Sequence, residues 1–158
     1  MGRKNSPSAN KELNELIAQY ETARAENRQL YLDGDQLADI ADQYAAGRKF
    51  NEAQEVITYG LHLHPDSTDL LVEQAYLYLD TGKIPLAKKV VESITDEYDT
   101  DVKMLKAELM LNEGQLENAR NVLDTIEDAD ELETIINIVY LYMDMGCLLY
   151  TSPSPRDS

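Results

Sequence analysis

The chain is poor in the residues that build covalent frameworks and catalytic centres. Its 158 residues include one cysteine, two histidines, one phenylalanine and no tryptophan. A single cysteine excludes a disulfide framework and a cysteine-rich zinc module, and it favours a reducing, cytoplasmic compartment. No apolar stretch follows Arg3 and Lys4, so we expect no signal peptide.

Basic residues are also scarce. Lysine and arginine number 14 against 30 aspartates and glutamates, which gives a formal net charge of −16. This balance argues against unaided binding to nucleic acid or to an anionic membrane, because both require basic patches. The longest apolar run, residues 135–143, is interrupted by Asn137 and is shorter than the roughly 18–20 residues that span a bilayer.

Hydrophobic residues make up 43% of the chain, which is enough for a packed core. The length suits one domain on the scale of roughly 100–200 residues. The negative charge is distributed unevenly along the chain. Residues 1–33 contain five acids and five bases, whereas residues 34–146 contain 24 acids and eight bases. Any electrostatic function is therefore expected after residue 33.

Motifs of catalysis and of metal binding are missing. The chain has no G-x-G-x-x-G, Walker, G-x-S-x-G or H-E-x-x-H pattern. His62 and His64 are two residues apart, so on a helix they point in different directions. The acidic segment 95–101 lacks the glycine and the closing glutamate of a calcium loop, and we expect it to be a solvated loop with a helix cap. We predict a protein that is not an enzyme and has no cofactor or bound metal.

Small residues recur at nearly constant spacing, which indicates internal repeats. Two alanine series have separations of 34 and 32 residues: Ala41, Ala75 and Ala107, and Ala53, Ala87 and Ala119. A glycine series has a spacing of 32: Gly82, Gly114 and Gly146. Apolar residues at i, i+3, i+4 and i+7 surround the alanines and predict helices. We interpret each unit as a helical hairpin that buries its apolar face by stacking on the next.

The first unit carries the fullest pattern. Leu37-x-x-Ile40-Ala41-x-x-Tyr44 is followed by Ala53 and then by Pro65. A unit of about 34 residues with these landmarks resembles the tetratricopeptide repeat. The resemblance implies an all-α fold, a right-handed solenoid of helical hairpins. The later units lack the closing proline, and the tryptophan usual near the start of the repeat is absent from all of them, which affects the expected curvature rather than the hairpins.

The repeats predict how the chain is organised. The expected segments are a disordered start (1–9), a helix with its link (10–33), three repeats (34–67, 68–99 and 100–131), the first helix of a truncated fourth repeat (132–146) and a non-native tail (147–158). Residues 147–157 resemble a translated sequencing adaptor, which is why we expect the native sequence to be interrupted near Gly146. We expect the first helix to cap the solenoid, with self-association or partner binding as the alternative.

In tetratricopeptide proteins the first helix of each hairpin lines a concave groove. Matching places here imply a groove that is acidic with apolar islands: Asp35, Asp42, Asp69, Val72, Tyr76, Asp80, Asp101, Met104, Glu108, Ile136 and Tyr140. None of them is Lys, Arg or Asn, the residues with which related proteins hold the acidic tails of chaperones. The chain also resembles short acidic bacterial members of the family, which are cytosolic as a rule. This resemblance implies a cytoplasmic protein of the same class.

We predict a scaffold or adaptor that binds a basic or amphipathic peptide in this groove. One alternative is that the tyrosines pack between helices and the acids serve solubility. A second is that the solenoid is the N-terminal regulatory part of a longer enzyme or signalling protein. A third is self-association through the last helix, about 131–145, which is apolar nearly all round.

Overall fold

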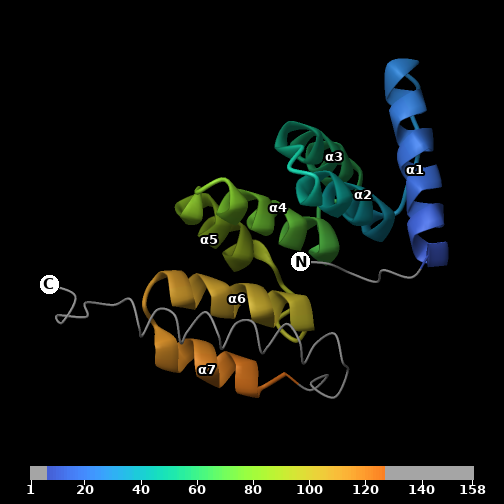
Figure 1. The fold of residues 1–158 in the computed structure, drawn as a ribbon. Coiled ribbons are helices and arrows are strands. Elements are labelled where there is room, and N and C mark those ends of the chain that lie inside the picture. Colours follow the sequence, from blue (N-terminus) through green and yellow to red (C-terminus); the bar gives the residue numbers. More distant parts are fainter. Residues whose placement is uncertain (1–6, 127–158) are drawn as a thin grey trace, which may run out of the picture. The chain divides into compact units, whose positions relative to one another are not determined.

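The computed structural model describes residues 7–126, and these form seven α-helices with no strand (Figure 1). The chain divides into two compact units, residues 1–95 and 96–158, which are described separately here. The first unit contains α1 (Pro7–Ala25), α2 (Gly34–Ala46), α3 (Phe50–Leu63), α4 (Thr68–Asp80) and α5 (Ile84–Ser93). The second contains α6 (Thr100–Asn112) and α7 (Leu116–Asp124). The all-α chain of helical hairpins predicted from the repeats is confirmed. The predicted fourth repeat and tail lie outside the described residues.

The first hairpin, α2 with α3, contains a fully buried core. Leu37, Ile40 and Ile57 are at most 1% exposed, and the small residues Ala41 and Ala53 lie among them. Alanine at these places lets the two helices approach closely, as the repeat pattern predicts. The backbone N–H of Asp33 donates to Oε1 of Gln36 at 3.0 Å, which helps to satisfy the free N-terminal end of α2.

The second hairpin, α4 with α5, packs directly on the first. Gly60 of α3 permits this contact, since a Cβ atom there would lie 2.8 Å from Cδ1 of the fully buried Leu70. Beside it, Gln54 and Gln74 exchange two amide hydrogen bonds of 2.9 and 3.0 Å. The turn into α5 uses Gly82 at φ +78°, a conformation that costs glycine little.

The second unit repeats the hairpin plan. Met104, Ala107 and Leu111 of α6 form a core with Ala119 and Leu123 of α7. The side chain of the residue before α6, Asp99, accepts hydrogen bonds from the backbone N–H groups of Asp101 (2.8 Å) and Val102 (3.2 Å). An aspartate in that position satisfies N–H groups that have no partner inside the helix.

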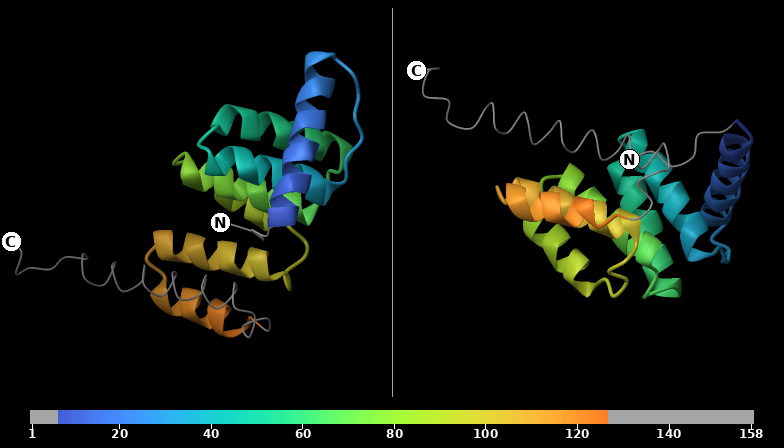
Figure 2. Two further views of the ribbon diagram at one scale, coloured as in Figure 1. Left: turned by 45° about the vertical axis from the view of Figure 1, so that its right-hand side comes forward. Right: turned by 90° about the horizontal axis from the view of Figure 1, so that it is seen from below.

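Apolar periodicity in the sequence predicts a first helix over roughly residues 10–29, and α1 begins and ends earlier than that. It starts at Pro7 rather than near Asn10, because proline is well suited to a first helical turn. It ends at Ala25 rather than near Gln29, since Asn27 adopts a left-handed φ of 54°. Figure 1 and the right-hand view of Figure 2 place α1 beside α2 and away from α5. This is the position that a cap on the first repeat would occupy.

Candidate functional site

The predicted groove residues of the first unit lie on two helices that pack side by side, α2 and α4. Asp35 and Asp80 are exposed, whereas Asp42, Asp69 and Tyr76 are half-buried. We call these five residues the acidic face. They combine four carboxylates with one aromatic ring on adjacent helices.

The helices around the acidic face carry charge of one sign. Among the residues of α2, α3 and α4 there are eight acids and neither lysine nor arginine. Asp42, Asp69 and Tyr76 also take part in polar or electrostatic interactions within the protein. Desolvation raises the pKa of the Asp80 carboxyl above its ordinary value. The face as a whole is suited to cationic ligands.

Two predicted apolar anchors are wrong. Val72 is 2% exposed on α4, and Met104 is 1% exposed in the core that α6 forms with α7. Neither side chain presents surface to a ligand, because both are almost completely buried. The repeat pattern identifies the helix on which these residues lie but does not distinguish its core side from its outer side.

The remaining predicted residues fall outside the first unit. Asp101 and Glu108 are half-buried on α6 of the second unit, and each takes part in polar or electrostatic interactions. Ile136 and Tyr140 lie outside the described residues, as does the last helix proposed for self-association.

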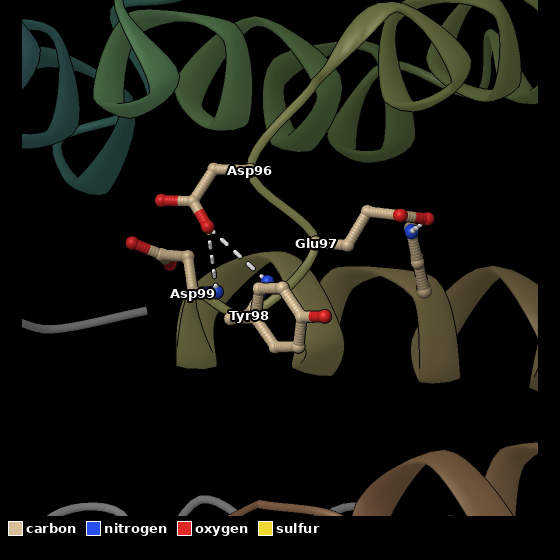
Figure 3. A network of polar contacts seen from close by, with 5 residues as sticks. Asp96, Glu97, Tyr98 and Asp99 are labelled. Carbon is tan, nitrogen blue, oxygen red and sulfur yellow. Dashed lines mark hydrogen bonds and ion pairs between the residues drawn. The ribbon is translucent and has the colours of Figure 1, made fainter.

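The acidic segment before α6 is organised around the start of that helix. The Asp96 carboxylate accepts hydrogen bonds from the backbone N–H groups of Tyr98 and Asp99, both at 3.2 Å (Figure 3). Glu97 pairs instead with Lys106 at 3.7 Å. Over residues 7–126, no group of three or more acidic, histidine or cysteine side chains is arranged to hold a metal ion. The segment is a loop that ends in the N-cap residue of α6, Asp99, and its Tyr98 is 85% exposed.

The two histidines have separate environments. Nε2 of His64 lies 2.8 Å from the carbonyl oxygen of Leu32, and its ring meets the edge of Tyr31 with 5.3 Å between centroids. His64 therefore holds the link between α1 and α2 against the end of α3. His62 is exposed.

Tyrosines attach α1 and its link to the first hairpin, a role that the repeat pattern does not predict. The Tyr44 hydroxyl donates to the Glu21 carboxylate at 2.5 Å, and the Tyr59 hydroxyl donates to the carbonyl of Leu30 at 2.6 Å. Burial, followed by the hydrogen bond to Glu21, raises the pKa of Tyr44. Burial likewise raises the pKa of Tyr20, whose hydroxyl has no hydrogen-bond partner.

Two open hollows mark the surface of the first unit. One, of about 440 Å³, lies at the start of α2 and is lined by Gly34, Asp35, His64, Pro65, Asp66 and Ser67. The other, of about 410 Å³, lies beside α1 and is lined by Ala18, Gln19, Thr22, Arg28 and Leu30. In the first hollow, Ser67 and His64 both meet the backbone: Oγ of Ser67 accepts a hydrogen bond from the N–H of Leu70 at 3.3 Å, and Nε2 of His64 lies 2.8 Å from the Leu32 carbonyl oxygen. In the part of the chain that the structure describes, no helix is long and apolar enough to cross a membrane.

Stacked helical hairpins define a helical-repeat protein. Residues 44–109, from the end of α2 into α6, match the family model of the tetratricopeptide repeat. This match identifies tetratricopeptide repeats within residues 44–109. Such repeats generally mediate protein–protein interactions, and the family is typically non-enzymatic. Comparisons with curated proteins and with solved structures give no significant match.

Proposed function

We propose that the chain is a protein-interaction scaffold whose acidic face binds a basic or amphipathic peptide segment. The observation that supports this proposal is the eight acids of α2, α3 and α4, with no lysine or arginine among them. A basic partner approaching this surface is attracted before contact, which raises its association rate.

The acidic face also supplies a site for an apolar side chain. Tyr76 is half-buried on α4, the helix that also carries Asp69 and Asp80, and an aromatic ring can bury area while keeping a polar edge in water. Lysine or arginine side chains of the peptide would meet Asp35 and Asp80, the two exposed carboxylates, and an apolar residue would cover Tyr76. Val72 and Met104 have no part in this arrangement, because both are buried.

Charge reversal at the exposed carboxylates tests the proposal. The probe is a labelled peptide that alternates lysine with leucine, and its affinity is measured by fluorescence anisotropy at low and at raised salt. Asp35→Lys with Asp80→Lys is expected to weaken binding by about tenfold at low salt, and raised salt is expected to reduce the difference.

The matched control reverses two exposed acids of α1, Glu12→Lys with Glu15→Lys, which changes the net charge by the same amount. Circular dichroism checks that both variants remain helical. If the two variants lose affinity equally, the probe responds to total charge and the acidic face is not the site. Full affinity in the Asp35/Asp80 variant would have the same meaning.

A further inference from the structure

Helix α5 differs in charge from the helices before it. It carries Lys88 and Lys89 against the single acid Glu92, and Lys83 occupies the position just before its first residue. Of the seven helices within residues 7–126, α5 is the one in which bases outnumber acids. A local basic surface is unexpected in a chain with a net charge of −16, and it suggests a function separate from the acidic face.

The outer side of α5 presents two lysines with a leucine between them. Ala87 and Val91 point into the core, whereas Lys83, Leu86 and Lys89 are exposed. A separation of three residues makes Leu86 a neighbour of each lysine along one side of the helix. We call these three residues the α5 stripe. Leu86 is 42% exposed, and only Tyr31 and Tyr98 among the large hydrophobic residues of the described chain are also exposed.

Both lysines of the stripe are available to a partner. Within the described residues, neither Lys83 nor Lys89 forms a salt bridge or a side-chain hydrogen bond. Lys83 lies at the N-cap of α5 and Lys89 six residues further on, with Leu86 midway between them in the sequence. Six helical residues correspond to about 9 Å of axial rise between Cα atoms.

We propose that the α5 stripe docks an acidic peptide segment, with carboxylates on Lys83 and Lys89 and an apolar side chain on Leu86. The two lysines favour a partner with negative charge. Leu86 favours a peptide over nucleic acid, because a phosphate backbone has no apolar group that could cover the leucine side chain. A second copy of the chain is a poorer occupant. Two copies, each with a charge of −16, repel each other, and this repulsion is strongest at low salt. Attraction between lysine and carboxylate is also strongest at low salt, so the repulsion opposes self-association under the conditions that most favour the stripe.

The stripe and the acidic face lie on different helices, so the proposal does not depend on the binding of a basic peptide to α2 and α4. Together the two surfaces would let one chain hold two partners of opposite charge. This is a concrete form of adaptor activity, in which the chain raises the local concentration of one partner near the other.

The test uses a labelled peptide with blocked ends, Glu-Glu-Ala-Ala-Leu-Ala-Ala-Glu-Glu, titrated with the full chain and followed by fluorescence anisotropy. Lys83→Glu with Lys89→Glu is expected to weaken binding by about tenfold, because each favourable pair becomes a repulsive one. Leu86→Ala, and separately a peptide with alanine in place of its leucine, are each expected to weaken binding by about threefold.

The matched control is Lys11→Glu with Arg24→Glu, which changes the net charge equally at two exposed positions of α1. It is expected to retain affinity within about twofold. Equal losses in the two double variants would overturn the proposal, as would unchanged binding when the α5 stripe is reversed.

Two further measurements examine the other occupants. Sedimentation of the chain alone is expected to show no oligomer that depends on Lys83 and Lys89, and such an oligomer would make a second copy the occupant. A short DNA duplex is expected to bind more weakly than the peptide. Tighter binding of the duplex that is lost on reversing the stripe would overturn the proposal in favour of nucleic acid.

Discussion

The first unit contains two joints between helices that are built on different principles. Where α3 meets α4, the backbones approach closely at Gly60, and Gln54 and Gln74 satisfy each other's amides. Where α1 meets the first hairpin, long side chains reach across instead. Tyr44 bonds to Glu21, and Tyr59 bonds to the carbonyl of Leu30.

The comparison shows how differently the two joints are written in the sequence. Close approach requires a small residue at a defined place, which within the hairpins appears as the regular alanine series, whereas between the hairpins it rests on Gly60 alone, since Ile94 and Ile126 occupy the equivalent places. A hydroxyl that reaches a carbonyl needs only a tyrosine within range, and this leaves no regular pattern. The joint between hairpins should therefore depend on shape, and the α1 joint on a few individual hydrogen bonds.

The largest expected effect is at the close approach. Gly60→Val places side-chain atoms against Cδ1 and Cδ2 of Leu70, which is fully buried. We expect a loss of about 3 kcal/mol in the free energy of unfolding, measured by urea denaturation. Gly47→Ala is the control, since its Cβ would meet nothing closer than 3.6 Å and should leave stability nearly unchanged. Equal stability of the two variants would show that close packing at Gly60 is unimportant.

The amide pair should show strong coupling. Gln54→Leu leaves the 6%-exposed Gln74 with an unsatisfied amide and is expected to cost about 2 kcal/mol. Gln54→Leu combined with Gln74→Leu removes both partners and should cost less than either single change. The measurement is a double-mutant cycle of unfolding free energies. Simple additivity would mean that the amide pair makes no specific contribution.

For the tyrosines of the α1 joint, the change in stability on removing the hydroxyl should depend on whether that hydroxyl forms a hydrogen bond, and not on how deeply it is buried. Tyr59→Phe removes the donor to the Leu30 carbonyl and is expected to cost about 1 kcal/mol. Tyr20→Phe removes a buried hydroxyl that has no partner, so stability should stay the same or rise. Thermal unfolding of the two variants measures the difference. A greater loss for Tyr20→Phe would mean that its hydroxyl has a partner in solution.

The smallest expected effect at neutral pH concerns ionisation of the same joint. Burial raises the pKa of both Tyr20 and Tyr44 in the folded protein above the ordinary tyrosine value of about 10. Their contribution to stability is therefore complete below about pH 10 and falls as the pH rises above it, since the unfolded chain then releases these protons more readily. Unfolding midpoints between about pH 8 and 11 should fall less steeply in a Tyr20→Phe/Tyr44→Phe variant than in the parent. Parallel curves would contradict this assignment.

Several elements were predictable from the sequence in detail. N-cap residues and apolar periodicity in the sequence predict helices over 68–80 and 100–112, and these are the bounds of α4 and α6. The acidic character of α2 and α4 was equally visible. The burial of Val72 and Met104 was not, because a helical period does not reveal which of two apolar sides another helix will cover.

By itself, the sequence determined that the chain forms acidic helical hairpins of the tetratricopeptide type, since spacing, small residues and charge are properties of neighbouring positions. Only the tertiary structure decided which side chains remain at the surface. It buried two expected anchors, exposed Leu86 between two lysines and connected Tyr44 and Tyr59 to α1 and its link. The physical reason is that exposure and hydrogen bonding depend on what packs against a residue, and those neighbours lie more than 20 positions away along the chain for both tyrosines.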